Sequence, residues 1–308
     1  YNTVKSIAAY LKTMGTPPDL SIQDSQDMQI ESDYRLFSLS SGQKGLWFIH
    51  QTEPDGFAYN VPMAYRISGE VNVKALENAF EHLRERHPVL KARMENRKNG
   101  PVGIIDPDVG LCFEREDIRD IRDEEMTNFL NLRTREPFDL EKGPLMRVRL
   151  FSCSHREHIL LIDLHHIIFD GTSSLILIKD LIHFYKKASG SNLPDLKTLP
   201  AAYEDFVDWQ TKMLNSDIGE MHKRYWLEKM SGTAPVLNLP FDRLKSTDTK
   251  RKGGLCTKNL DHELAAQLKT LASDRNVFTS SVSLSAFKVL LHRYTGQEEI
   301  LVAVPADG

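Results

Sequence analysis

The sequence predicts an α+β fold, because helical and strand patterns of apolar residues alternate along the chain. Helical spacing of apolar residues covers residues 72–86, 172–187, 221–230, 264–275 and 280–294. Short apolar runs flanked by polar residues predict strands at 64–68, 145–151, 158–164 and 299–305. A chain of 308 residues can bury a large core, and this length suits two lobes.

Glycine and proline mark where several of these elements end. The helix over 72–86 stops before Pro88, because the residue preceding a proline is disfavoured in helical conformation. The helix over 280–294 ends at Gly296, a residue type suited to a left-handed cap. Residues 189–200 mix Ser, Gly, Pro and Leu, which predicts a crossing between lobes at 34–190 and 191–308.

The first 33 residues are expected to lie outside these lobes. Residues 1–15 carry apolar side chains at helical spacing, and a Pro17-Pro18 pair stops the pattern. So short a helix does not stand alone, so it either completes a preceding domain or packs on the main body. Residues 16–33 are rich in Ser, Gln, Asp and Pro and predict a flexible linker.

Composition excludes several classes of function. Thirty-nine basic and 43 acidic residues give a net charge of -4, without the basic footprint of a nucleic-acid-binding protein. The three cysteines are widely spaced, so neither a disulfide framework nor a metal cluster is predicted. No apolar run reaches membrane-spanning length and no signal-peptide pattern is present, so we expect a cytoplasmic protein without a membrane partner.

The strongest chemical motif is LHHIIFDG at residues 164–171, between a predicted strand and a predicted helix. Side chains alternate across a strand, so His165 and His166 should point to opposite faces. That geometry argues against a metal site, whose ligands must converge, and leaves two hydrogen-bonded core histidines as an alternative. Asp170 either pairs with an arginine or caps the helix, and Gly171 lets a ligand approach the backbone.

This HHxxxDG segment resembles the signature of the condensation domains of nonribosomal peptide synthetases. Three further segments resemble motifs of that family in the same order: residues 40–47 (SSGQKGLW, family SxAQxRLW), 86–94 (RHPVLKARM, family RHxxLRTxF) and 203–209 (YEDFVDW, family YxDFxxW). Taken singly, the first could be a plain amphipathic helix start and the last an aromatic-anchored surface helix. The chain departs from the family pattern at Gly42, Gly45 and Lys91.

The resemblance covers the chain from residue 34 to its end and implies a two-lobed, V-shaped fold like that of chloramphenicol acetyltransferase. The active site of such domains lies in a tunnel between the lobes. Later motifs of the family do not appear before Gly308, so we expect the second lobe to be incomplete and the isolated piece to fold incompletely or to be inactive. Residues 1–15 then resemble the last helix of an upstream carrier domain.

The function implied is amide formation between a carrier-bound acyl or peptidyl thioester and a carrier-bound aminoacyl amine. Phosphopantetheine arms of upstream and downstream carrier domains deliver both substrates, adjacent synthetase domains are further partners, and no cofactor is expected on the chain itself. His166 is the catalytic candidate, as general base or as a group that positions the amine. His165 is expected to support it, and Gly171 and Ser173 to contact substrate.

Asp170 is expected to be architectural, with a partner that the sequence leaves open. Lys91 stands where the family has arginine, and lysine does not offer the planar, two-pronged contact of a guanidinium. Arg93 shares the strand face of Lys91 and is the alternative partner.

The subtype is read from what surrounds the signature. The aspartate pattern of heterocyclisation domains is absent, and Ser173-Ser174-Leu175 replaces the Ser-Trp-Arg-like segment of epimerisation domains. The segment after Gly171 resembles domains that take an unepimerised donor, and residues 43–59 favour a polyketide-derived donor. Two alternatives stay open: an acyltransferase acting on a soluble acceptor, and a non-catalytic domain that docks carriers or acts as a gatekeeper.

Overall fold

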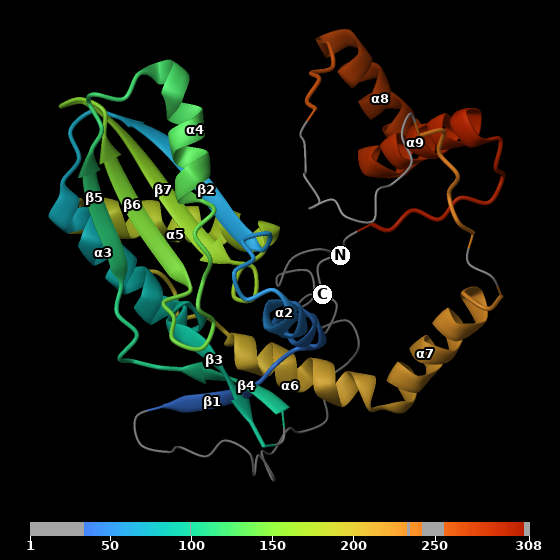
Figure 1. Cartoon of the computed structure of the whole chain (residues 1–308), viewed down its shortest axis with the longest axis horizontal. Coiled ribbons are helices and arrows are strands. Elements are labelled where there is room, and N and C mark those ends of the chain that lie inside the picture. The colour runs from blue at the N-terminus through green and yellow to red at the C-terminus, as the bar shows by residue number, and fades with distance from the viewer. Residues whose placement is uncertain (1–33, 99, 233–234, 242–255, 305–308) are drawn as a thin grey trace. The chain divides into compact units, whose positions relative to one another are not determined.

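The computed structural model describes residues 34–98, 100–232, 235–241 and 256–304. The predicted carrier-like helix at 1–15 and linker at 16–33 lie outside the described residues. The chain divides into two compact units between Glu220 and Met221, and each is described by itself (Figure 1).

The first unit is built on a four-stranded sheet in the order β2 (Asn60–Ser68), β7 (Glu157–His165), β6 (Met146–Ser152) and β5 (Cys112–Asp117). Strand β7 pairs antiparallel with β2 and β6, and β5 pairs parallel with β6. A second, antiparallel sheet has the order β1 (Arg35–Ser38), β4 (Gly100–Ile105) and β3 (Ala92–Arg97).

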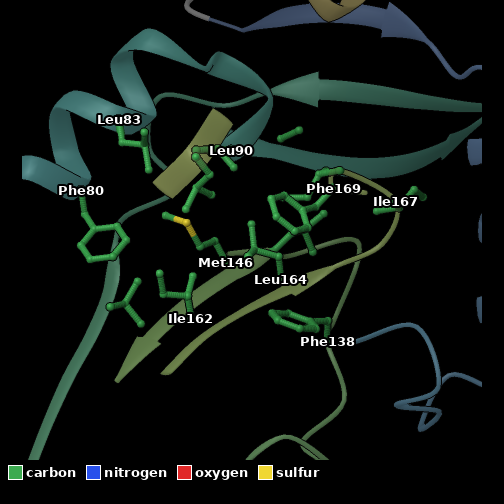
Figure 2. Packing of buried hydrophobic residues seen from close by; sticks show 14 of the residues in the cluster. Phe80, Leu83, Leu90, Phe138, Met146, Ile162, Leu164, Ile167 and Phe169 are labelled. Carbon is green, nitrogen blue, oxygen red and sulfur yellow. The ribbon is translucent and has the colours of Figure 1, made fainter. Parts of the chain in front are cut away.

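Helices cover both faces of the four-stranded sheet (Figure 1). Helices α3 (Val73–Arg86) and α5 (Gly171–Ala188) bury one face, and α4 (Asp123–Arg133) packs on the other. Alternate residues of β7 therefore enter two cores: Ile162 and Leu164 join the larger one, while Ile159 and Leu161 face α4. Figure 2 shows the larger core around Ile162 and Leu164.

Two segments that resemble family motifs, residues 86–94 and 203–209, make polar contacts within this unit. The second begins helix α6 (Tyr203–Leu214). At the end of α3, Arg86 Nε and His87 Nε2 lie 2.8 and 2.9 Å from the buried carboxylate of Asp180 on α5. Helix α6 lies against β1, where Arg35 and Glu204 form a 2.6 Å ion pair. Residues 203–209 thus belong to the first unit.

The remaining described helices complete the element list: α2 (Ser41–Thr52), the short 3-10 helix η1 (Pro88–Lys91), α7 (Asp217–Lys229), α8 (His262–Asp274) and α9 (Thr279–Thr295). In the second unit α8 packs on α9, and Gly296 ends α9 with a φ of 69°. None of the helices among the described residues is long and apolar enough to cross a membrane.

The α+β class is confirmed, and each predicted helix within the described residues is present with ends that shift by a few residues. The predicted strand at 299–305 is wrong over its described part, because residues 299–304 form no regular structure. A strand needs a neighbour to satisfy its backbone groups, and the described part of the second unit contains none for it to pair with.

Candidate active site

The HHxxxDG segment forms the junction between β7 and α5. Strand β7 ends at His165, a tight turn follows, and α5 begins at Gly171. Two backbone hydrogen bonds close the turn, from the N–H of Ile168 to the carbonyl of His165 (3.1 Å) and from the N–H of Phe169 to that of His166 (3.3 Å). The side chains at 167–169 are buried, so the turn is held from below by the core (Figure 2).

His165 is the buried member of the histidine pair. Its Nδ1 accepts a hydrogen bond from the backbone N–H of Ile167 at 3.1 Å, which places the proton of the neutral ring on Nε2. The ring lies edge-on to Phe138, with centroids 6.0 Å apart, and to His50 at 6.4 Å. Burial, with smaller contributions from His50 and His166, lowers the pKa of His165 to about 4. His165 is therefore uncharged at neutral pH, which suits the expected role of supporting His166.

His166 is the exposed member of the pair. Its backbone N–H donates to the carbonyl of Tyr59 on the neighbouring segment at 2.8 Å, so its Cα is fixed while its imidazole stays accessible. The ring of Tyr59 lies edge-on at 6.4 Å. The alternative that both histidines are core residues is wrong for His166. An accessible imidazole on a rigid turn is the geometry that a general base or a positioning group requires.

Three of the predicted motifs meet at this turn. Gln43 of α2 donates from Nε2 to the carbonyl of Ile167 at 2.9 Å. Its Oε1 accepts from the N–H of Ser40, while the Ser40 hydroxyl accepts from the N–H of Gln43, so the pair forms the capping box of α2. The hydroxyl of Tyr203 donates to the same Ser40 oxygen at 3.0 Å. Residues 40–47 and 203–209 therefore brace the HHxxxDG turn.

Asp170 caps α5. Its Oδ1 accepts hydrogen bonds from the N–H (2.7 Å) and the hydroxyl (2.6 Å) of Ser173, so the Ser173 hydroxyl predicted to contact substrate is engaged in the cap. Neither Lys91 nor Arg93, the two positions considered as its partner, forms an ion pair with Asp170 among those of the described residues. Arg93 instead pairs with Asp106 at 2.8 Å.

Arg93 and Lys91 have other partners, near the end of β4. Arg93 belongs to β3 of the three-stranded sheet, where it reaches Asp106 at 2.8 Å and Glu95 at 3.3 Å. Lys91 ends η1 and contributes its backbone carbonyl to the N–H of Asp106 at 3.1 Å. Both positions therefore organise the loop after β4 rather than the head of α5.

Gly171 has no structural reason to be glycine within this unit. Its φ lies outside the left-handed region, and a Cβ added to it would meet no atom within 4 Å. As the first residue of α5 it has an N–H without an intrahelical partner. Open space beside a free backbone donor, next to the exposed His166, is the arrangement expected where a ligand approaches the main chain.

A buried polar pair escaped the sequence reasoning. Asp163 on β7 is 1% exposed and accepts a hydrogen bond from Arg147 Nη2 on β6 at 2.9 Å. Burial raises the pKa of Asp163 to about 6, against the opposing effect of Arg147. The signal was present in the sequence, because an acid interrupts the apolar run that ends in His165. Its partner was not readable, since it depends on strand register.

The placement of the potential metal ligands can be described for the part of the chain that the structure covers. No group of three or more His, Cys, Asp or Glu side chains is placed there to hold an ion. The two histidines of the motif cannot converge on one ligand position, because one is buried under the turn and the other faces outward.

A family model for the condensation domain matches residues 34–308. Polyketide synthase PksN of Bacillus subtilis is 40% identical over 272 residues, which is 88% of this chain and 5% of that protein. Bacitracin synthase 3 of Bacillus licheniformis is 34% identical over 307 residues, 99% of this chain and 5% of that protein. The chain thus spans a small fraction of these relatives.

Solved structures share the fold. A four-domain nonribosomal peptide synthetase bound to AMP and glycine superposes with a TM-score of 0.73 at 23% identity, over 85% of this chain and 20% of that one. The first condensation domain of the calcium-dependent antibiotic synthetase gives a TM-score of 0.70 at 20% identity, over 86% of this chain and 62% of that one.

Proposed function

The chain belongs to the condensation-domain family, and from that premise we propose that it transfers a carrier-bound acyl or peptidyl group to the amine of a carrier-bound aminoacyl group. The observation that carries the proposal is the exposed imidazole of His166 on a braced turn, beside the open backbone of Gly171. That this chain has the condensation activity is part of the same proposal.

The reaction forms one C–N bond and breaks one C–S bond. The neutral amine attacks the thioester carbonyl, the resulting ammonium loses a proton, and the donor phosphopantetheine leaves as a thiol that takes up a proton. A proton released from the ammonium nitrogen needs an acceptor within hydrogen-bond reach, and the imidazole of His166 is the group proposed to take it. Such a base contributes about 10² to 10⁴-fold in rate.

Gly171 supports the same step from the head of α5. A tetrahedral intermediate carries negative charge on the former carbonyl oxygen, and the N-terminus of a helix offers free N–H groups and a favourable dipole to such a charge. A side chain at this position would occupy the space through which the substrate reaches that backbone. Phosphopantetheine arms of the two carriers would bring both reactants to this point.

Intact-protein mass spectrometry tests the proposal in the full-length synthetase module. A loaded donor carrier and a loaded acceptor carrier are mixed with the module, and the acceptor should gain the mass of the donor acyl group. His166→Ala should abolish that gain. His155→Ala, at an exposed histidine beyond the opposite end of β7, is the matched control and should leave it unchanged. A full gain with His166→Ala would contradict the assigned role, and no gain with wild type despite carrier binding would favour a docking domain.

We further propose a polyketide-derived donor. The 40% identity to a polyketide synthase of Bacillus subtilis supports this choice over a purely peptidyl donor. Loading the donor carrier with a β-hydroxyacyl group and, in parallel, with an aminoacyl group tests it, and a faster gain with the aminoacyl donor would contradict it. Replacing the acceptor carrier by a free amine tests whether the domain acts on a soluble acceptor.

A further inference from the structure

We propose that Arg147 and Asp163 are positioning residues for His166, acting through Phe138 and His165. The inference rests on the proposed function, because it assigns a role at the same site. Neither residue belongs to the HHxxxDG turn, and both lie on the face of the four-stranded sheet that α4 covers.

Strand register places the pair beside the motif. Arg147 of β6 lies directly opposite Asp163 of β7, and the hydrogen bond between them spans 2.9 Å. Asp163 and His165 are two residues apart on β7, so their side chains leave the same face of the sheet. Asn60 of β2 lies opposite His165 on the other side of the strand.

An aromatic ring connects the ion pair to the buried histidine. The guanidinium carbon of Arg147 lies 3.7 Å from the centroid of the Phe138 ring. The Phe138 ring also contacts the ring of His165 edge-on, with centroids 6.0 Å apart. Phe138 belongs to the large core with Leu164 of β7 (Figure 2). The order Asp163, Arg147, Phe138, His165 is therefore a continuous series of contacts.

The segment that carries Phe138 is tied down from both neighbours of β7. Asn60 Nδ2 donates to the carbonyls of Thr134 (2.9 Å) and Glu136 (2.8 Å). Arg147 Nη2 donates to the carbonyl of Glu136 at 2.6 Å as well as to Asp163. Asp163 thus orients the guanidinium of Arg147. That guanidinium holds the 134–138 segment next to His165 through its hydrogen bond to Glu136 and its contact with the Phe138 ring.

His165 restrains the backbone on either side of His166. Its Nδ1 accepts the N–H of Ile167, so a side chain of residue 165 and the backbone of residue 167 bracket the catalytic candidate. If Phe138 moved away, water would reach the His165 ring and favour its charged form. A doubly protonated ring has no acceptor at Nδ1, so the bond to Ile167 would be lost.

Several titratable groups face these residues. Arg147, Arg149 and Glu136 surround Asp163, and His50 and His166 lie near His165. Asp163 Oδ1 and Arg147 Nε are buried without a hydrogen-bond partner among the described residues. An imperfectly satisfied buried ion pair is a poor source of stability, and well-packed apolar residues often replace one without loss. A purely structural pair should therefore be dispensable as a pair.

The test is the double substitution Arg147→Met with Asp163→Leu in the full-length module. Removing both charges avoids stranding either one, so the melting temperature should stay within a few degrees of wild type. Condensation should slow at least tenfold through kcat rather than KM, and the acidic limb of its pH profile should move to higher pH. Hydrogen exchange at the amides of residues 166–169 should rise at least tenfold.

Arg84→Met is the control, because Arg84 is also a buried arginine, but it lies on α3 and pairs with Glu81 at 2.8 Å, so among the described residues it makes no contact with the 134–138 segment. It should lower stability without changing exchange at 166–169. Wild-type rate and exchange in the double variant, or equal changes in the control, would overturn the proposal. If wild type forms no amide, the exchange measurement still decides it. If the double variant does not fold, Phe138→Leu and Asp163→Asn take its place with the same readouts.

Discussion

Asp163→Asn should make the first unit markedly more sensitive to acid, because two buried groups on β7 have opposite pH dependences. The pKa of His165 is lowered to about 4 by burial, so the folded state keeps this ring neutral while the unfolded chain protonates it below 6.5. Stability is therefore lost as the pH falls from 6.5 to 4. A difference of 2.5 pKa units corresponds to about 3 kcal/mol at 1.36 kcal/mol per unit.

Asp163 acts in the other direction. Its pKa is raised from 3.8 to about 6 in the folded state, so burying the ionised carboxylate destabilises the fold above pH 6. Protonation relieves that penalty as the pH falls from 6 to 3.8, again by about 3 kcal/mol. In the wild type the two effects nearly cancel between pH 6.5 and 4. An asparagine cannot titrate, so the variant keeps only the loss that His165 causes.

Urea unfolding at pH 7.0, 5.5 and 4.5 measures the effect, with the fluorescence of buried Trp47 as a reporter of the first unit. Between pH 7 and 4.5 the variant should lose about 2 kcal/mol more than wild type, because Asp163 would otherwise gain stability over the 1.5 units below its pKa of about 6. Asp208→Asn, at an exposed carboxylate of α6, should follow the wild-type curve. Parallel curves for Asp163→Asn and wild type would refute the reasoning.

Three further substitutions separate architecture from chemistry. Gly171→Ala should keep stability within about 1 kcal/mol, because its Cβ meets no atom, yet reduce acceptor acylation at least tenfold in the mass assay. Asp170→Ala should destabilise by about 1 kcal/mol through loss of the α5 cap, and Asp170→Ser should restore most of that in thermal unfolding; failure of the serine would argue for a role beyond capping. Gly103→Ala places a Cβ 2.1 Å from the Phe37 ring and should destabilise by about 1 to 3 kcal/mol in urea unfolding, whereas an unchanged midpoint would show that the ring moves freely.

Much of the fold was predictable because its signals are local. The helical spacing of apolar residues predicted α3 and α5, and Gly296 marked the end of α9. The alternation of side chains along β7 predicted that His165 and His166 face opposite sides. The capping role of Asp170 also follows from nearby residues, since its partner is Ser173. The strand expected at 299–305 failed for the opposite reason, because a strand exists only with a partner.

Local patterns in the sequence predicted the α+β class, the position of the motif between a strand and a helix, and the candidate residues of the site. Tertiary structure alone decided their surroundings. Gln43 reaches Ile167 across 124 positions, Arg147 meets Asp163 through the register of β6 and β7, and Arg93 is engaged by Asp106. Propensity and capping act within a turn or two of chain, whereas these contacts follow from packing, which brings distant residues together and sets both burial and pKa.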